Sequence, residues 1–219
     1  MFRNRKDTIY VVLAGIFITN AIVAELIGGK LIHVGAPVMS VGILPWPVVF
    51  ITTDLINEYF GEKGVKRLSV ITACLIAYCF LMLWMAIKIP AATDLPNVTD
   101  EQFTAVFGQS MWIIIGSIIA FLVSQLIDVT IFHFLKKKTG KKMLWLRSTG
   151  STVISQFFDS FIVLGIAFYL TGIMDTETYL ISGFTGYSVK LIIAILLTPL
   201  IYLGHNLIDQ YLAKDGAEN

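Results

Sequence analysis

The sequence predicts an all-α integral membrane protein with six transmembrane helices and both termini in the cytoplasm. Composition is the first reason, because 56% of the 219 residues are hydrophobic and only 14% are charged, whereas a soluble domain carries about 25% charged residues. Long apolar runs and an alternation of basic and acidic loops are the other two. Together they exclude an ordinary water-soluble fold and favour a single transmembrane domain over residues 1–219.

Six runs are long and apolar enough to cross the hydrocarbon core, which takes about 20 residues of helix. They cover residues 9–27, 43–60, 68–87, 111–135, 149–171 and 180–207. Residues 28–42 lie between the first two runs and are rich in glycine. Because this segment is too short to span and glycine interrupts it, the pattern predicts an outer hairpin or a re-entrant loop.

Lysine and arginine gather in every second loop, which sets the orientation because short cytoplasmic loops hold the positive excess. Basic residues precede the first run, follow the second and separate the fourth from the fifth, where Lys136, Lys137 and Lys138 are adjacent. Acidic residues such as Asp94 and Asp175 occupy the alternate loops. A topology of six spans with both termini in the cytoplasm places every basic loop on the cytoplasmic side and the acidic loops on the outer side.

Several functional classes are disfavoured by composition. The net charge of +1 argues against a nucleic-acid binder, which would show a strong basic excess. Cys74 and Cys79 lie in one apolar run, and His33, His133 and His205 show no H-x-x-x-H or H-E-x-x-H spacing. We therefore expect no disulfide framework, no metal site and no cofactor.

Ionisable residues inside the spans are the informative ones, because each costs about 2.5–3.5 kcal/mol at a helix centre and so by default marks function. Four lie too deep to reach the interface: Asp54, Asp128, Asp159 and Lys190. Lys190 requires a partner, and Asp54 and Asp159 are the leading candidates. Glu58 lies one turn beyond Asp54 on the same face. Glu25, near the end of the first run, and Glu58 can also be explained by snorkelling to the interface.

A short repeat connects the fourth and fifth runs. Residues 124–128 and 155–159 share the pattern Ser-Gln-apolar-apolar-Asp at an offset of 31, which also aligns Ser117 with Ser148. In each run hydroxyl, amide and carboxylate fall on one helix face. Adjacent spans run antiparallel, so this is an inverted match of the kind that transporters use around a midplane site. Coincidence or shared chemistry explains a five-residue match as well as duplication does.

Such a face suits a flat polar heterocycle with several N–H donors and a carbonyl, because carboxylates accept hydrogen bonds and amides both donate and accept. Ser155 adds a hydroxyl to the same face. Aromatic residues on these helices could stack on the ring, although most aromatics at helical spacing pack against lipid or a neighbouring helix. The aromatic candidates are Trp46, Phe50, Phe157, Phe158 and Tyr187.

The order and spacing of these residues resemble the queuosine precursor transporter family. The pattern consists of Asn20, Pro47-x5-Thr53-Asp54-Leu55, Glu58-x-x-Gly61, Gln125-x-x-Asp128-Val129, Ser151-Thr152-x3-Gln156-x2-Asp159 and Tyr187-x-x-Lys190. The resemblance implies a multi-pass protein of the bacterial inner membrane that takes up 7-deazaguanines such as preQ0 and preQ1. A homodimer is among the assemblies left open.

Carried over position by position, the resemblance implies a set of substrate-binding or coupling residues. These are Asn20, Asp54, Gln125, Asp128, Gln156, Asp159 and Lys190. Secondary candidates are Glu58, Trp46, Phe50, Ser155, Phe157 and Tyr187.

Three other interpretations fit the size or the charges. A substrate-capture subunit of an energy-coupling-factor importer has a similar helix count, but its A-x-x-x-A motif is absent, since Ala21 and Ala24 are three apart. An intramembrane aspartyl protease would use Asp128 and Asp159 as a dyad, yet the G-x-G-D signature is missing. A purely structural membrane protein is disfavoured by the number of buried charges.

Overall fold

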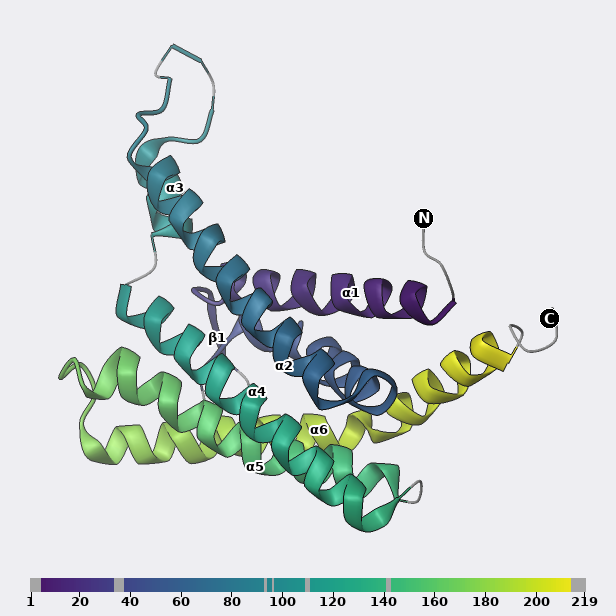
Figure 1. Cartoon of the computed structure of the whole chain (residues 1–219). Coiled ribbons are helices and arrows are strands. Elements are labelled where there is room, and N and C mark those ends of the chain that lie inside the picture. The colour runs from purple at the N-terminus through teal and green to yellow at the C-terminus, as the bar shows by residue number, and fades with distance from the viewer. Residues whose placement is uncertain are drawn as a thin grey trace.

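The structure is a computed structural model that describes residues 5–33, 38–92, 94–95, 97–108, 111–140 and 143–213, and these residues are almost all helical (Figure 1). Within the described residues five helical segments are long and apolar enough to cross a membrane. They contain α1 (Arg5–Ile27), α2 (Trp46–Ile87), α4 (Met111–Thr139), α5 (Leu144–Leu164) and α6 (Thr176–Ala213). The prediction of a helical, multi-pass membrane protein is therefore confirmed.

Most of the predicted span 43–60 and all of the span 68–87 belong to one helical element, α2, which begins at Trp46. For this reason five helices of this kind, instead of six, are found in the described residues. Gly61 interrupts α2 with φ 74° and ψ 178°. Glycine adopts positive φ at little cost because it has no Cβ. Pro47 lies in the first turn of α2, where its missing N–H is not needed.

The glycine-rich segment contains two paired strands, and its position on the outer side of the membrane stays a prediction. β1 (Leu31–His33) pairs antiparallel with β2 (Val38–Ser40), which is followed by the short 3₁₀ helix η1 (Val41–Ile43); residues 34–37 lie outside the described residues. Ser40 Oγ donates to the Gly28 carbonyl at 2.6 Å. A Cβ at Gly42 would lie 2.6 Å from the Ala24 carbonyl oxygen, so the hairpin packs closely against the end of α1.

The remaining helices agree with the predicted spans except at their ends. α5 begins at Leu144 and continues into a π-helical turn, η2 (Gly165–Tyr169), whereas α6 extends beyond its predicted span at both ends. The short helix α3 (Asp100–Phe107) precedes α4 and starts with a capping box between Thr99 and Gln102.

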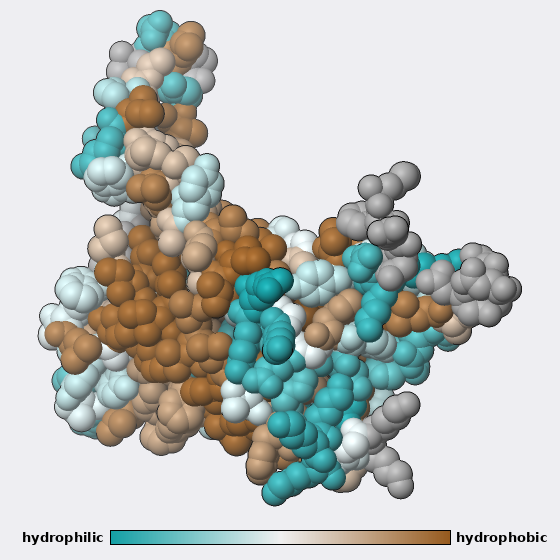
Figure 2. Space-filling view, in the orientation of Figure 1, coloured by the Kyte–Doolittle hydropathy of each residue, from teal (hydrophilic) through white to brown (hydrophobic). Residues whose placement is uncertain are grey.

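Hydrophobic side chains cover much of the outside of the molecule, and many polar side chains are buried inside it. Figure 2 shows a broad hydrophobic area beside a hydrophilic one on this face. Tyr78, Trp84 and Leu196 are more than half exposed, whereas Ser69, Asn57 and Ser151 are fully buried. This distribution is the reverse of that in a soluble protein and fits a lipid-facing exterior with a polar interior.

A hydrophobic cluster and the packing of neighbouring helices hold the polar residues in place. Phe17 of α1, Ile56 of α2 and Phe121 of α4 belong to one buried cluster. α4 and α5 pack along each other, and α5 packs against α6. The polar faces of α4 and α5 therefore meet each other and are flanked by α1, α2 and α6.

Candidate functional site

The two Ser-Gln-x-x-Asp segments meet across the α4–α5 interface and exchange hydrogen bonds. Ser155 Oγ of α5 donates to Asp128 Oδ1 of α4 at 3.2 Å, and Ser124 Oγ of α4 lies 3.3 Å from Asp159 Oδ1 of α5. All four side chains are buried. The serine of each segment thus contacts the aspartate of the other, so the sequence repeat corresponds to a reciprocal contact in space.

Ser117 and Ser148, which the offset of 31 also aligns, each donate a hydrogen bond to a carboxylate on a flanking helix. Ser117 Oγ of α4 donates to Glu25 Oε2 of α1 at 2.5 Å. Ser148 Oγ of α5 donates to Asp54 Oδ2 of α2. Each serine therefore presents its hydroxyl to a carboxylate on an outer helix, α1 on one side and α2 on the other.

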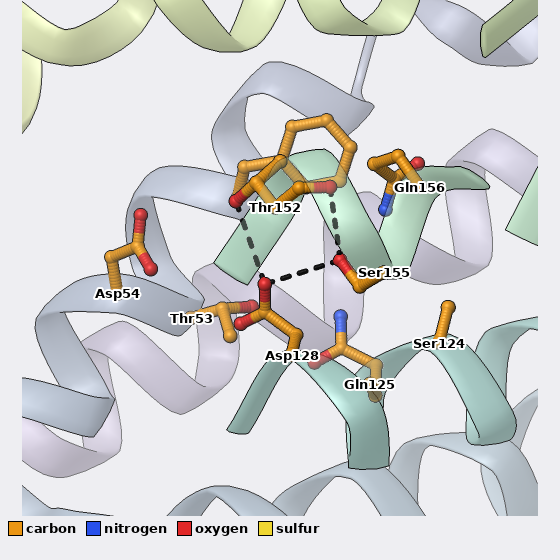
Figure 3. A pocket seen from close by; sticks show the side chains of 9 residues that line it. Thr53, Asp54, Ser124, Gln125, Asp128, Thr152, Ser155 and Gln156 are labelled. Carbon is orange, nitrogen blue, oxygen red and sulfur yellow. Dashed lines mark hydrogen bonds between the residues drawn. The ribbon is translucent and has the colours of Figure 1, made fainter. Parts of the chain in front are cut away.

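A narrow polar cavity of about 10 Å³ lies on the α2 side of the helix pair (Figure 3). A space of this size holds about one water-sized body. Its walls come from α2, α4 and α5, as Figure 3 shows for the labelled side chains. The lining residues are Phe50, Thr53, Asp54, Ser124, Gln125, Asp128, Thr152, Ser155 and Gln156. Six of the predicted site residues are therefore brought together here.

A larger cavity of about 440 Å³ lies on the α1 and α6 side. This volume is in the range of small-molecule sites, which is about 300–1,000 Å³. Its walls include apolar side chains such as Val163 and Phe168 and the indole of Trp46. Its ionisable lining residues are Glu25, Asp159 and Lys190. Of the predicted site residues, Asp159, Lys190 and Trp46 line this cavity.

Lys190 is paired with an intramembrane carboxylate, as expected. Its Nζ lies 2.5 Å from Asp159 Oδ2, and both side chains are largely buried. The alternative prediction, that Lys190 pairs with Asp54, is wrong. Asp54 lines the narrow cavity and accepts a hydrogen bond from Ser148 instead. The larger cavity consequently contains two carboxylates and one ammonium group.

Glu58 has a structural contact that explains it without a substrate. Glu58 Oε2 lies 2.9 Å from Arg147 Nη2 and 3.0 Å from Lys136 Nζ. Arg147, which the sequence places with the other charges of a basic loop, is 1% exposed and also donates to the Gly140 carbonyl at 2.7 Å. The Glu58 cluster thus ties α2 to the α4–α5 connection.

Besides Glu58, three of the predicted site residues and secondary candidates lie outside both cavities. The Asn20 amide donates to the Ile16 carbonyl of its own helix at 2.9 Å, and Asn20 is not among the lining residues. Phe157 and Tyr187 meet edge to face with ring centroids 5.6 Å apart, and neither is among the lining residues. Their assignment to the site stays a prediction.

Glu25 and Ser117 are site residues that the sequence reasoning did not select. Glu25 lies near the end of its span, so snorkelling accounted for it; its hydrogen bond to Ser117 instead directs it inward. The offset of 31 that aligns Ser117 with Ser148 was the available signal. Thr53 and Thr152 also line the narrow cavity. Both belong to the family pattern, Thr53 beside Asp54 and Thr152 four residues before Gln156.

Comparison with known proteins identifies the family. Residues 40–204 match the family described as "Putative vitamin uptake transporter". The chain belongs to this family. It is therefore a transporter and not an enzyme.

Relatives of this transporter support the same assignment. A protein of Bacillus subtilis (strain 168) named "Probable queuosine precursor transporter" is 28% identical over 171 residues, which are 77% of this chain and 72% of the relative. A protein of the same name from Haemophilus influenzae (strain ATCC 51907 / DSM 11121 / KW20 / Rd) is 28% identical over 160 residues, which are 71% of this chain and 63% of the relative. No solved structure matches the chain. The resemblance inferred from the motifs is confirmed.

Proposed function

We propose that this transporter imports queuosine precursors, that is, 7-deazaguanine bases such as preQ0 and preQ1, across the bacterial inner membrane. The names of the two relatives support the substrate class. The observation that carries the proposal is the cavity of about 440 Å³ that combines Glu25, Asp159 and Lys190 with apolar and aromatic walls. Few convergent polar groups in an apolar cavity are typical of a small-molecule site.

The polar groups of the cavity complement those of the base. A 7-deazaguanine presents N1–H and the 2-amino group side by side, and one carboxylate accepts from both; we assign this role to Glu25. The carbonyl O6 requires a donor, which the Lys190 ammonium supplies. Asp159 holds Lys190 in place through the 2.5 Å ion pair. Such a site rejects analogues that lack these groups, because its buried polar atoms would then be unpaired.

We further propose that the chain crosses the membrane six times with both termini in the cytoplasm. Gly61 then separates two spans within α2, and its positive φ supports a sharp change of direction there. Lys63, Lys66 and Arg67 follow Gly61 directly. Their charge favours a cytoplasmic position for this joint.

Uptake by this chain alone tests the proposed function. Proteoliposomes that contain the purified chain are incubated with preQ0, preQ1, queuine and guanine, and the trapped base is measured by mass spectrometry. We expect 7-deazaguanines to accumulate well above protein-free vesicles. Uptake of guanine without any 7-deazaguanine would contradict the substrate class. Binding without transport would favour a substrate-capture subunit that needs a separate ATPase.

A further inference from the structure

The narrow cavity contains acceptor oxygens that receive no hydrogen bond from the described part of the chain. They are Asp54 Oδ1, Gln125 Oε1 and Asp128 Oδ2. The three side chains are only 2%, 5% and 6% exposed, respectively, and all of them line this cavity. Two carboxylates and one amide that line this narrow cavity therefore carry buried oxygens without a hydrogen-bond partner among the described residues.

The hydroxyl and guanidinium donors nearby are engaged elsewhere, and the amides of Gln125 and Gln156 bring N–H donors but no positive charge. Asp54 Oδ2 accepts from Ser148, and Asp128 Oδ1 accepts from Ser155 at 3.2 Å. The Thr53 hydroxyl donates to the Val49 carbonyl at 2.8 Å, which leaves its oxygen lone pairs as further acceptors. The guanidinium of Arg147, which precedes Ser148, contacts Glu58 at 2.9 Å.

Leaving these oxygens unpartnered is costly. A buried charge must be paired and hydrogen-bonded, because burial removes the water that would otherwise solvate it. Among the described residues that line the cavity there is no lysine, arginine or histidine. A bound cation would supply the compensating charge, and a proton on one carboxyl group is the alternative that the experiments below distinguish.

The size and chemistry of the cavity identify that cation. A water molecule donates two hydrogen bonds and so cannot satisfy three acceptors. Carboxylate, amide and hydroxyl oxygens are the ligands of hard cations. Mg²⁺ keeps several waters and Ca²⁺ takes 6–8 oxygens, whereas about 10 Å³ admits one water-sized body. The described residues also hold no group of three or more His, Cys, Asp or Glu suited to a metal ion.

We propose that the cavity between Asp54, Gln125 and Asp128 binds one Na⁺ ion that couples to substrate import. The inference rests on the proposed function, because a coupling ion is useful only to a transporter. Ser124 connects the narrow cavity to the larger one, where we propose that the base binds. Ser124 lines the narrow cavity, and its Oγ lies 3.3 Å from Oδ1 of Asp159, which lines the larger cavity. Na⁺ held against α4 and α5 fixes the helix interface on which Asp159 and its partner Lys190 depend.

Direct ion binding tests this site without any base present. The purified full chain in detergent is titrated with ²²Na⁺ in a scintillation proximity assay. We expect saturable binding of one ion per chain, weakened at least tenfold in Asp54→Asn, in Asp128→Asn and in Gln125→Met. Glu177→Gln removes a carboxylate at an exposed position in the first turn of α6, outside both cavities, and should retain ²²Na⁺ binding. K⁺ should compete poorly, because it is larger than Na⁺.

Several results would overturn the sodium site. They are an absence of saturable ²²Na⁺ binding, unchanged binding in both Asp54→Asn and Asp128→Asn, equal loss in Glu177→Gln, and displacement by Ca²⁺ at much lower concentration than by Na⁺. If a variant fails to elute as a single species, the wild-type protein still decides. NaCl must raise its Tm relative to choline chloride, and an equal Tm in both salts rejects the proposal.

Transport assays separate this proposal from the proposed function. Uptake of preQ1 into proteoliposomes is measured with an inward Na⁺ gradient and with equal Na⁺ on both sides. We expect the gradient to raise accumulation at least severalfold. Uptake that responds only to a pH gradient would assign the carboxylates to a proton and leave import intact. Binding of ²²Na⁺ without uptake of any base would refute import and leave the cation site standing.

Discussion

Ser155 Oγ on α5 donates to Asp128 Oδ1 on α4 at 3.2 Å, and the reverse contact joins Ser124 to Asp159 at 3.3 Å. The exchange relates two antiparallel helices by an approximate two-fold operation. Although the contacts are reciprocal, Asp128 faces the narrow cavity and Asp159 the large one. One helix pair thereby carries two cavities of different size, one on each side.

The reciprocal contacts predict different consequences for the two serines. Ser124→Ala removes the hydroxyl that donates to Asp159, so base binding should weaken. Ser155→Ala removes the hydroxyl that donates to Asp128, so its effect on ligand binding should be confined to the narrow cavity. Each change leaves a buried acceptor less satisfied and should cost about 1–3 kcal/mol of stability. Tm in detergent and preQ1 binding measure the two effects. Ser188→Ala, at an exposed serine bonded within its own helix, is the control. Equal loss of base binding in Ser124→Ala and Ser155→Ala would contradict the separation of the cavities.

Much of the helical fold was predictable because the bilayer requires it. A backbone in hydrocarbon must satisfy its own hydrogen bonds, so apolar runs of about 20 residues become helices. That Lys190 pairs with a buried carboxylate followed from the cost of a stranded charge, whereas the choice of Asp159 over Asp54 came from the structure. The helices and the need for a carboxylate partner depend on position along the chain and need no knowledge of packing.

The division of the site into two cavities could not be predicted in this way. A sequence gives the depth of Asp54 and Asp159 along their helices but not how the helices rotate against one another. Glu25 shows the same limit, since its hydrogen bond to Ser117 comes from α4 packing on α1. Arg147 was assigned to a solvated loop because its partner Glu58 is far away in sequence.

The Lys190–Asp159 pair predicts a stability defect that a second change repairs. Lys190→Met leaves the Asp159 carboxylate without its cation, which typically costs about 3–5 kcal/mol. Adding Asp159→Asn removes the stranded charge, so Tm should recover toward wild type while uptake remains lost. Adding Asp54→Asn instead should not restore Tm, because Asp54 belongs to the other cavity. Rescue by Asp54→Asn would show that the pairing described here is wrong.

Glu25 predicts a loss of base recognition without a loss of protein. Glu25→Gln keeps the size of the side chain and one acceptor oxygen but presents an amide N–H toward donors of the base. We expect preQ1 binding to weaken at least tenfold, which corresponds to about 1.4 kcal/mol. The matched control is Glu177→Gln, an exposed residue in the first turn of α6. The amount of each variant in the membrane is compared first, and isothermal titration calorimetry then measures the affinity of each purified variant for preQ1. Unchanged affinity in Glu25→Gln would remove Glu25 from the site.

The six-span topology predicts which loops an impermeant reagent can label from outside the cell. In a variant whose Cys74 and Cys79 are replaced by serine, single cysteines are introduced at Lys138 and at Asn97. Because basic loops remain in the cytoplasm, an impermeant maleimide added to intact cells should label Asn97→Cys, and Lys138→Cys only after the membrane is opened. A cysteine at Lys63, just beyond Gly61, should behave like the one at Lys138. Labelling of Lys63→Cys in intact cells would show that Gly61 is not a cytoplasmic joint, and α2 would then have to cross the membrane once.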